Sequence, residues 1–349
     1  MKIGIGLRYS GAQIDIPVRL VQRAEQLGYE SVWTAEAFGS DALTPLAYLA
    51  AQTTRIKLGT AIAQLAARTP ANLAMSAQTL DALAGGGRAL IGIGVSGPQI
   101  VEGWYGQPWG RPADRLRDYT AIMKKIWKRE GPVVHAGPEI SLPYEGPGSS
   151  GLGKPLKSIL HGNPDIPVLI GATTPGNIRL AGEIADGWLP SEIMTIGVRK
   201  HLASLEAGIA LRKDGKTLKD FRIQGQVSVA LTDNLSAAFA DAKNEVALYV
   251  GGMGSKDKNF HKENMIRRGY AEVAERVQEL FLAGKKAEAA AAIPDEFVDE
   301  GTLIGSAARI RERWKMWRDL PLTGITINRP TEPVLELMAQ VAVEAPGGI

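Results

Sequence analysis

Short apolar runs alternate with longer segments of helical periodicity along most of the chain. Each run is bounded by glycine or polar residues, as strands are. Eight strands are predicted in this way, at Lys2–Leu7, Ser31–Thr34, Ile56–Ile62, Ala89–Gly94, Ile166–Gly171, Gly187–Pro190, Ile223–Leu231 and Leu322–Ile327. Parallel strands joined by crossover helices give this alternation, and eight strands close a barrel. We therefore predict an α/β fold, a (β/α)₈ TIM barrel with insertions, as a single domain over residues 1–349.

Residues that start and stop helices mark the segments between the strands. Asp15 is predicted to be the N-cap of the first helix, with Pro17 in its first turn and Gly28 at its end. Thr69 with Pro70 is predicted to begin the third helix.

Two segments depart from the alternation. A stretch rich in Gly, Pro and Ser, at about 131–165, follows a predicted helix at Pro112–Arg129. It is longer than the usual connection in such folds, so we predict an insertion over the active face. Residues of about 236–305 show helical patterning without a strand, and we expect extra helices beside the barrel mouth.

Composition narrows the classes of partner and chemistry. Lys and Arg number 40 against 37 Asp and Glu, without a basic block, so no nucleic acid partner is predicted. No apolar run approaches the roughly 20 residues that span a bilayer, so we predict no membrane partner and a cytoplasmic location. The chain has no cysteine and four His far apart in sequence. Thiol chemistry is therefore excluded, and no metal site is predicted.

The reactive end of such a barrel is formed by the residues that follow each strand. Gly171–Asn177 is a small, hydroxyl-bearing loop that leads into a helix. Helix starts bind anions through free N–H groups and the helix dipole, so a cofactor phosphate is one interpretation. The alternative is a plain N-cap turn without a ligand.

Two further strand ends offer candidate residues. Glu36 follows the second strand, where it could accept a proton or bond a ring; the alternative is a structural carboxylate that caps a loop amide. Gly92 and Gly94 lack the spacing of a dinucleotide fingerprint. They could let the strand approach a flat ring, or serve packing alone.

None of the four His lies at a strand end. No catalytic base is therefore predicted among them. They are His135, His161, His201 and His261.

Several of these segments together resemble the bacterial-luciferase-like superfamily, particularly its members that use the deazaflavin coenzyme F420. The resemblance rests on four stretches: Ser31-Val-Trp-Thr-Ala-Glu36; Ile56–Ile62 followed by Arg68-Thr-Pro70; Thr79-Leu-Asp-Ala-Leu with Gly86-Gly-Arg88 and Ile91-Gly-Ile-Gly94; and Gly171–Pro175 with Leu180–Gly187. Jointly these motifs are specific, whereas each alone is weak.

The resemblance implies a luciferase-like barrel with a cis peptide in strand three, here at Ala61 and Ile62, that supports the cofactor ring. The family's ring-contacting positions correspond to Glu36 and Gln64, with three neighbours beside the ring: Val95, Ser96 and Gly97. Its phosphate-binding positions correspond to Thr173, Thr174, Gly176 and Asn177.

The chain also departs from the family pattern. Several deazaflavin members carry an Asp-His pair after strand two, where this chain has Glu36 and Ala37, so the proton donor is not identified. Gly97 replaces an acidic residue of the sugar-phosphate dehydrogenase branch. The motifs are closer to the actinobacterial deazaflavin oxidoreductases and the methylenetetrahydromethanopterin reductase branch.

The function that the resemblance implies is an F420-dependent oxidoreductase that passes a hydride between the deazaflavin and a small organic substrate. Glu36 is the catalytic candidate, and a homodimer is expected from the family. The nearest alternative is an FMN-dependent luciferase-like monooxygenase. Two others are a non-redox barrel enzyme acting on a phosphorylated sugar and a flavin-binding protein without catalysis.

Overall fold

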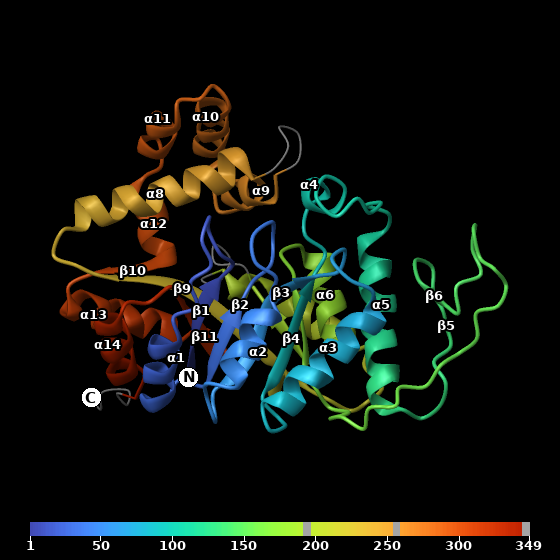
Figure 1. The fold of residues 1–349 in the computed structure, drawn as a ribbon. Coiled ribbons are helices and arrows are strands. Elements are labelled where there is room, and N and C mark those ends of the chain that lie inside the picture. Colours follow the sequence, from blue (N-terminus) through green and yellow to red (C-terminus); the bar gives the residue numbers. More distant parts are fainter. Residues whose placement is uncertain (191–196, 254–258, 344–349) are drawn as a thin grey trace.

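The computed structural model describes residues 1–190, 197–253 and 259–343. Eight parallel strands form a closed barrel (Figure 1). In order around the barrel they are β1 (Lys2–Arg8), β2 (Ser31–Thr34), β3 (Lys57–Gln64), β4 (Ala89–Gly94), β7 (Val168–Gly171), β8 (Gly187–Leu189), β9 (Arg222–Leu231) and β11 (Gly324–Asn328). The pairs β11–β1 and β8–β9 close the ring. The predicted TIM barrel is confirmed, and each predicted strand is found with its ends displaced by no more than two residues.

Helices surround the barrel. They are α1 (Val18–Gln26), α2 (Thr44–Ala50), α3 (Pro70–Leu83), α5 (Pro112–Lys128), α6 (Pro175–Ile184), α7 (Leu202–Ile209), α13 (Ala307–Arg318) and α14 (Glu332–Val343), with the short turns α4 (Pro98–Val101), η2 (Val198–His201) and η3 (Leu218–Asp220). Thr69 caps α3 as predicted, because its hydroxyl accepts from the Asn72 amide at 3.2 Å. The prediction for Asp15 is wrong: Pro17 is the N-cap residue of α1, since the helix begins three residues beyond Asp15, whereas Gly28 closes it with a φ of +86°.

The segment 131–165 does not cover the active face, and that prediction is wrong. Helix α5 leads the chain down the barrel wall, so the segment starts at the opposite end of the barrel (Figure 1). It forms a short hairpin, β5 (His135–Ala136) with β6 (Ser141–Leu142), and then an extended stretch on the outside. There Leu152 and Ile159 are 85% and 94% exposed.

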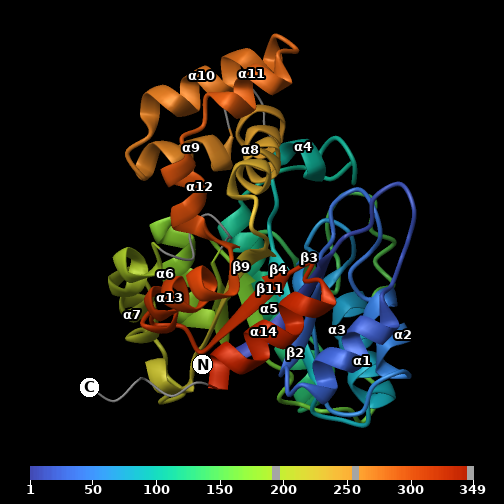
Figure 2. The ribbon, with the colours of Figure 1, turned by 90° about the vertical axis from the view of Figure 1, so that its left-hand side faces the viewer.

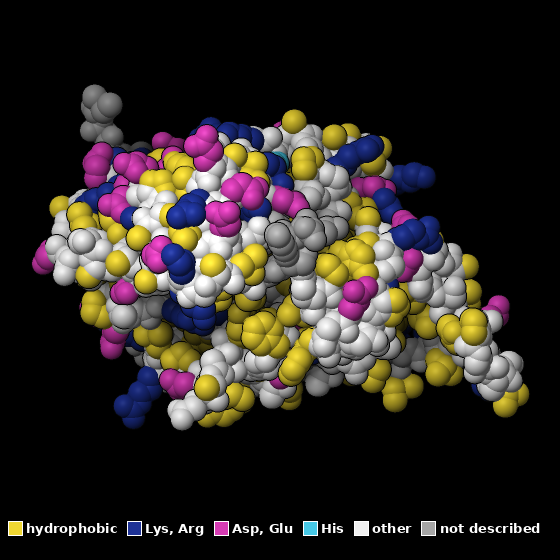
Figure 3. Space-filling view, turned by 90° about the horizontal axis from the view of Figure 1, so that it is seen from above, with side chains coloured by type: hydrophobic (Ala, Val, Ile, Leu, Met, Phe, Trp, Pro, Cys, Tyr) yellow, Lys and Arg dark blue, Asp and Glu magenta, His cyan; other side chains and the backbone are white. Residues whose placement is uncertain are grey.

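Five helices lie across the C-terminal end of the barrel, and we call them the lid helices (Figures 1 and 2). They are α8 (Leu235–Gly252), α9 (Phe260–Arg267), α10 (Ala271–Leu282), α11 (Lys286–Ala291) and α12 (Asp295–Gly301). Their apolar side chains, among them Val250, Met265 and Val277, form a hydrophobic cluster separate from the barrel core. Seen from above, acidic and basic side chains are interspersed over this part of the molecule (Figure 3). Residues of about 236–305, which were predicted to lie beside the barrel mouth, therefore cover that mouth.

A ninth strand, β10 (Thr302–Gly305), follows the lid helices, where the sequence predicted no strand. Ser228 of β9 pairs with Asn328 of β11 and also with Thr302 of β10. The two partners therefore lie on opposite edges of β9, and β10 extends the sheet on the edge that β8 occupies lower down. A strand of only four residues, Thr302–Gly305, is too short for periodicity to distinguish it from the end of a helix.

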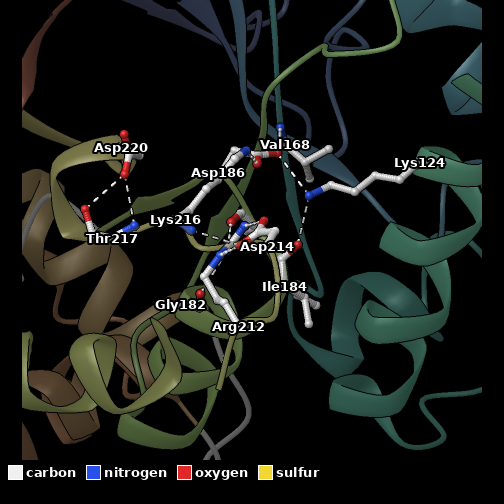
Figure 4. A network of polar contacts seen from close by, with 11 residues as sticks. Lys124, Val168, Gly182, Ile184, Asp186, Arg212, Asp214, Lys216, Thr217 and Asp220 are labelled. Atoms are coloured by element: carbon white, nitrogen blue, oxygen red, sulfur yellow. Dashed lines mark hydrogen bonds and ion pairs between the residues drawn. The ribbon is translucent and has the colours of Figure 1, made fainter. Parts of the chain in front are cut away.

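A polar network around Asp186 lies at the other end of the barrel, where β7 and β8 begin. Asp186 accepts from Lys216 at 2.9 Å and from the Val168 amide at 3.1 Å, and pairs with Lys124 at 3.1 Å (Figure 4). These contacts join α5, β7 and the loop before β9. Within the described residues no helix is long and apolar enough to cross a membrane.

Candidate functional site

A cavity of about 670 Å³ lies between the C-terminal ends of the strands and the lid helices. Its volume is within the range of small-molecule and cofactor sites. It is lined by ten of the eleven predicted positions, namely Glu36, Ala61, Ile62, Gln64, Val95, Ser96, Gly97, Thr173, Thr174 and Asn177. Gly176 does not line it, and a Cβ at this residue would meet no atom within 4 Å.

Glu36 is buried at the end of β2 and is held by strong donors. Arg68 donates to its two carboxylate oxygens at 2.6 and 2.9 Å, and the backbone N–H of Gln64 donates at 2.8 Å. Charge-assisted, bidentate bonds of this kind are strong and fix geometry. The arrangement favours the alternative of a structural carboxylate that secures a loop amide over a proton acceptor.

Gln64, at the end of β3, lines the cavity and has one side-chain atom without a hydrogen-bond partner. Its side-chain nitrogen donates to the Glu36 carbonyl at 3.2 Å and to the Ser96 hydroxyl at 3.0 Å. Its side-chain oxygen is buried and has no hydrogen-bond partner. A buried acceptor left unpaired costs about 1–3 kcal/mol, so a ligand N–H at this point would be stabilised.

The cavity wall beside Gln64 is close-packed around Ile62. The peptide bond between Ala61 and Ile62 is cis, as the resemblance implies. A Cβ on Gly94 or Gly171 would lie 3.0 Å from the Ile62 side chain, so glycine allows Ile62 to lie between β4 and β7. Gly92 serves packing, because a Cβ there would lie 2.0 Å from the Thr60 carbonyl oxygen.

The loop after β7 begins helix α6 at the cavity edge. Thr174 is the N-cap residue, and its hydroxyl accepts from the Asn177 amide at 3.4 Å. Pro175 carries no N–H, so Gly176 supplies the first amide hydrogen of the helix. Thr173 and Asn177 line the cavity with Thr174. The positive end of the α6 dipole and these polar groups suit an anion.

The lid helices bring residues to the cavity that the sequence did not point to. Arg8, at the end of β1, donates to the Tyr249 hydroxyl at 2.8 Å and pairs with Glu245, both on α8. The His261 ring of α9 packs against the Tyr249 ring, with centroids 4.8 Å apart. Burial and the charge of Arg8 lower the pKa of His261 to about 4. No spacing in the sequence relates Arg8 to residues more than 230 positions away.

The other three His lie elsewhere. His135 contacts Asp118 at 3.0 Å, His161 contacts Arg129, and His201 packs near Trp188. None of the three lines the cavity, whereas His261 does. The described residues contain no cluster of three or more His, Cys, Asp or Glu that could hold a metal ion.

The residues present fit a planar heterocycle with a phosphorylated side chain. The close-packed wall at Ile62 offers a surface for a flat ring, and the Gln64 oxygen offers an acceptor for a ring N–H. The α6 terminus offers an anion site on the same cavity.

Comparison with known proteins agrees with this geometry. A protein of Mycobacterium tuberculosis provisionally named a coenzyme F420-dependent oxidoreductase is 44% identical over 344 residues, which are 98% of this chain and 99% of that protein. The 5,10-methylenetetrahydromethanopterin reductase of Archaeoglobus fulgidus is 26% identical over 314 residues, 90% of this chain and 89% of that enzyme.

Solved structures share the fold. The F420-dependent tetrahydromethanopterin reductase from Methanopyrus kandleri has a TM-score of 0.77 at 23% identity and covers 97% of both chains. A type II Baeyer–Villiger monooxygenase from Pseudomonas putida, in complex with FMN, has a TM-score of 0.61 at 20% identity, over 97% of this chain and 96% of that one. The sequence model of the luciferase-like monooxygenases matches residues 2–324. The predicted resemblance is thereby confirmed, and the chain belongs to the luciferase-like monooxygenase family.

Proposed function

We propose that this chain binds coenzyme F420 and transfers a hydride between the deazaflavin ring and a small organic substrate. The observation that carries the choice of cofactor is the 44% identity, over almost the whole chain, to a protein provisionally named F420-dependent. The cavity supports this choice of cofactor, because residues of the family motifs line it. Gln64 provides the acceptor, Ile62 the wall for a ring, and the loop with Thr173 and Thr174 the anion site.

The bound deazaflavin would supply a carbon that accepts or donates a hydride. In this proposal Ile62 supports the ring and the Gln64 oxygen accepts from a ring N–H. Thr173, Thr174 and the start of α6 hold the phosphate. The lid helices exclude water, and the fixed ring position orients the substrate for transfer.

Glu36 has a positioning role in this proposal. Its carboxylate fixes the Gln64 amide and the Arg68 guanidinium, and Gln64 in turn bonds Ser96. Three strand ends are thereby joined beneath the ring. The catalytic role predicted for Glu36 is replaced by this one, because both carboxylate oxygens are already engaged.

Fluorescence titration with F420 and, separately, with FMN tests the choice of cofactor. We expect F420 to bind and FMN to bind at least tenfold more weakly. Replacing Thr173 and Thr174 with Glu should abolish F420 binding, because two carboxylates would repel the phosphate. Ser149→Glu with Ser150→Glu adds the same charge on the exposed 131–165 segment and serves as the control. Tight FMN retention without F420 affinity would support the FMN-dependent monooxygenase instead.

We also infer that the barrel and the lid helices form one domain. The lid helices leave the barrel after β9 and return at β10, which pairs with that same strand. Limited proteolysis should therefore release no stable lid fragment without the barrel.

We further propose a homodimer that buries the outer face of α3. This face exposes Met75 and Leu83 at 58% and 62%, and its remaining exposed residues, Asn72, Thr79 and Ala82, are uncharged. The one charged residue of α3, Asp81, is buried, where it accepts from backbone amides that include those of Gly87 and Arg88. A helix without charge on its outer face is typical of a covered helix.

Light scattering after size-exclusion chromatography tests the dimer. Met75→Glu with Thr79→Glu should give monomers, while Met316→Glu, at a 44% exposed position of α13, should leave the dimer intact. A monomeric wild-type protein would contradict this proposal.

A further inference from the structure

The lid side of the cavity carries a polar cluster that the cofactor positions do not use. Tyr249 and Glu245 come from α8, His261 from α9 and Arg8 from the end of β1. All four side chains line the cavity. We call them the Tyr249 cluster.

Arg8 is fixed between the barrel and the lid. Its backbone has a φ of +63°, an uncommon conformation for a residue with a side chain, and the register of β1 with β2 shifts beside it. Its guanidinium pairs with Glu245, donates to the Tyr249 hydroxyl at 2.8 Å and lies 5.6 Å from the centroid of the Tyr249 ring. The cation therefore faces the oxygen atom of Tyr249 and is held there by the carboxylate.

The remaining acidic and basic groups on the cavity are largely engaged in pairs. Glu36 is bound by Arg68, and Arg268 pairs with Glu300 at 2.7 Å. Asp241 is exposed. The charged and titratable side chains that line the cavity around His261 are Arg8 and Tyr9 from the end of β1, Asp241, Glu245 and Tyr249 from α8, and Arg268 next to α9. Tyr249 and His261 are thus the groups best placed to exchange a proton or donate a hydrogen bond there.

We propose that the Tyr249 hydroxyl and the His261 ring bind the oxygen of a carbonyl substrate, which Tyr249 protonates as hydride reaches the carbonyl carbon. This proposal rests on the proposed function and names its substrate class. The hydride brings two electrons and one hydrogen to the carbon, and the π electrons of the C=O bond move to the oxygen. The oxygen takes the Tyr249 proton, so the product is an alcohol.

The cluster stabilises the charge that this step creates. Burial raises the pKa of Tyr249 and so keeps its hydroxyl protonated in the resting state, whereas Arg8, which donates to the same oxygen, lowers that pKa and stabilises the tyrosinate that remains after proton transfer. Arg8 and Glu245 are positioning residues, since they act through Tyr249. Burial and Arg8 lower the pKa of His261, so its ring is neutral near pH 7 and donates through a single N–H.

The test uses 4-(dimethylamino)cinnamaldehyde, whose visible absorption band moves to the red when its carbonyl oxygen accepts a strong hydrogen bond. The full chain is titrated with this aldehyde, both with and without oxidised F420, so that no turnover is needed. We expect a red-shifted band with the wild-type protein. Tyr249→Phe should lose most of the shift, and His261→Asn should lose part of it. Each variant should bind the probe about 3- to 10-fold more weakly, the effect of one hydrogen bond.

Matched controls come from outside the cavity. Tyr144→Phe and His161→Asn make the same chemical changes on the 131–165 segment and should match the wild type. Far-UV circular dichroism shows whether each variant is folded, and His261→Gln replaces His261→Asn if that variant is not. A wild-type shift and affinity in Tyr249→Phe and His261→Asn would overturn the proposal, as would an unshifted band in the wild type. If the wild type does not bind F420, the proposed function fails, whereas the titration without cofactor still decides on the carbonyl site.

Discussion

Arg68 holds Glu36 by two hydrogen bonds, at 2.6 and 2.9 Å, between side chains that are 15% and 4% exposed. The pair links the end of β2 to the loop that precedes α3. Because the Gln64 amide also donates to Glu36, the position of Gln64 depends on this ion pair.

Replacing Glu36 with Gln should destabilise the protein by about 3 kcal/mol, because a largely buried guanidinium would lose its counter-charge. F420 affinity should fall as well, since Gln64 and Ser96 would shift. Urea denaturation at pH 7 gives the free energy of unfolding. Glu183→Gln is the control, as it breaks the exposed pair with Arg117 and should change stability by less than about 1 kcal/mol. If Glu36→Gln kept full stability but lost turnover, Glu36 would have a role in the chemistry instead.

Gln78 offers a prediction of increased stability. Both polar atoms of its side chain are buried in α3 without a hydrogen-bond partner. Gln78→Met keeps the volume and removes the unpaired polar atoms, so we expect stability to rise by about 1 kcal/mol. Differential scanning calorimetry should show a higher Tm. A decrease would mean that the amide has a partner, such as a bound water.

We expect the stability of the fold to depend on pH through the Asp186 carboxyl. Burial alone would raise its pKa, but Lys124, Lys216 and the Val168 amide together hold the pKa below its ordinary value of 3.8. A carboxyl whose pKa is lower in the folded state stabilises the fold above its unfolded pKa. That stability should be constant from pH 7 to about 5 and be lost as the pH falls below about 4.

Denaturation curves between pH 7 and pH 3 measure this effect. Asp186→Asn should be less stable at pH 7, by about 2–3 kcal/mol, and the difference from wild type should shrink as the pH falls. Asp233→Asn, at an exposed position, should parallel the wild type throughout. A constant difference over the whole range would contradict the assignment.

We expect a second dependence of stability on pH, in a different pH range, through His261. Its pKa is lowered from 6.5 to about 4 by burial and by Arg8. The unfolded chain therefore binds this proton more tightly, and the contribution of His261 to stability should be lost as the pH falls from about 6.5 to 4. NMR of the ring protons should give a midpoint near pH 4. Arg8→Gln should raise that midpoint, because it removes the neighbouring positive charge; an unchanged midpoint would show that burial alone sets it.

The sequence predicted the barrel because its determinants are local. Each strand is a short apolar run next to its own turn and helix, so periodicity within a few residues locates it. Thr69 before Pro70 and Gly28 after α1 act on the nearest turn of backbone, and both were predicted correctly. The residues proposed to bind the cofactor could be named because the family motifs that carry them are short and lie at the ends of strands, and ten of the eleven line the cavity.

Only the tertiary structure decided what lies above the strand ends. The lid helices have a hydrophobic cluster of their own, and nothing in their periodicity states which face of the barrel they cover. The direction of α5 took the 131–165 segment away from the mouth, and strand β10 exists because β9 has a free edge there. Glu36 pairs with Arg68, and Arg8 pairs with Glu245 and Tyr249 of α8, through contacts between distant parts of the chain. Such contacts depend on how whole elements pack, which a pattern of neighbouring residues does not encode.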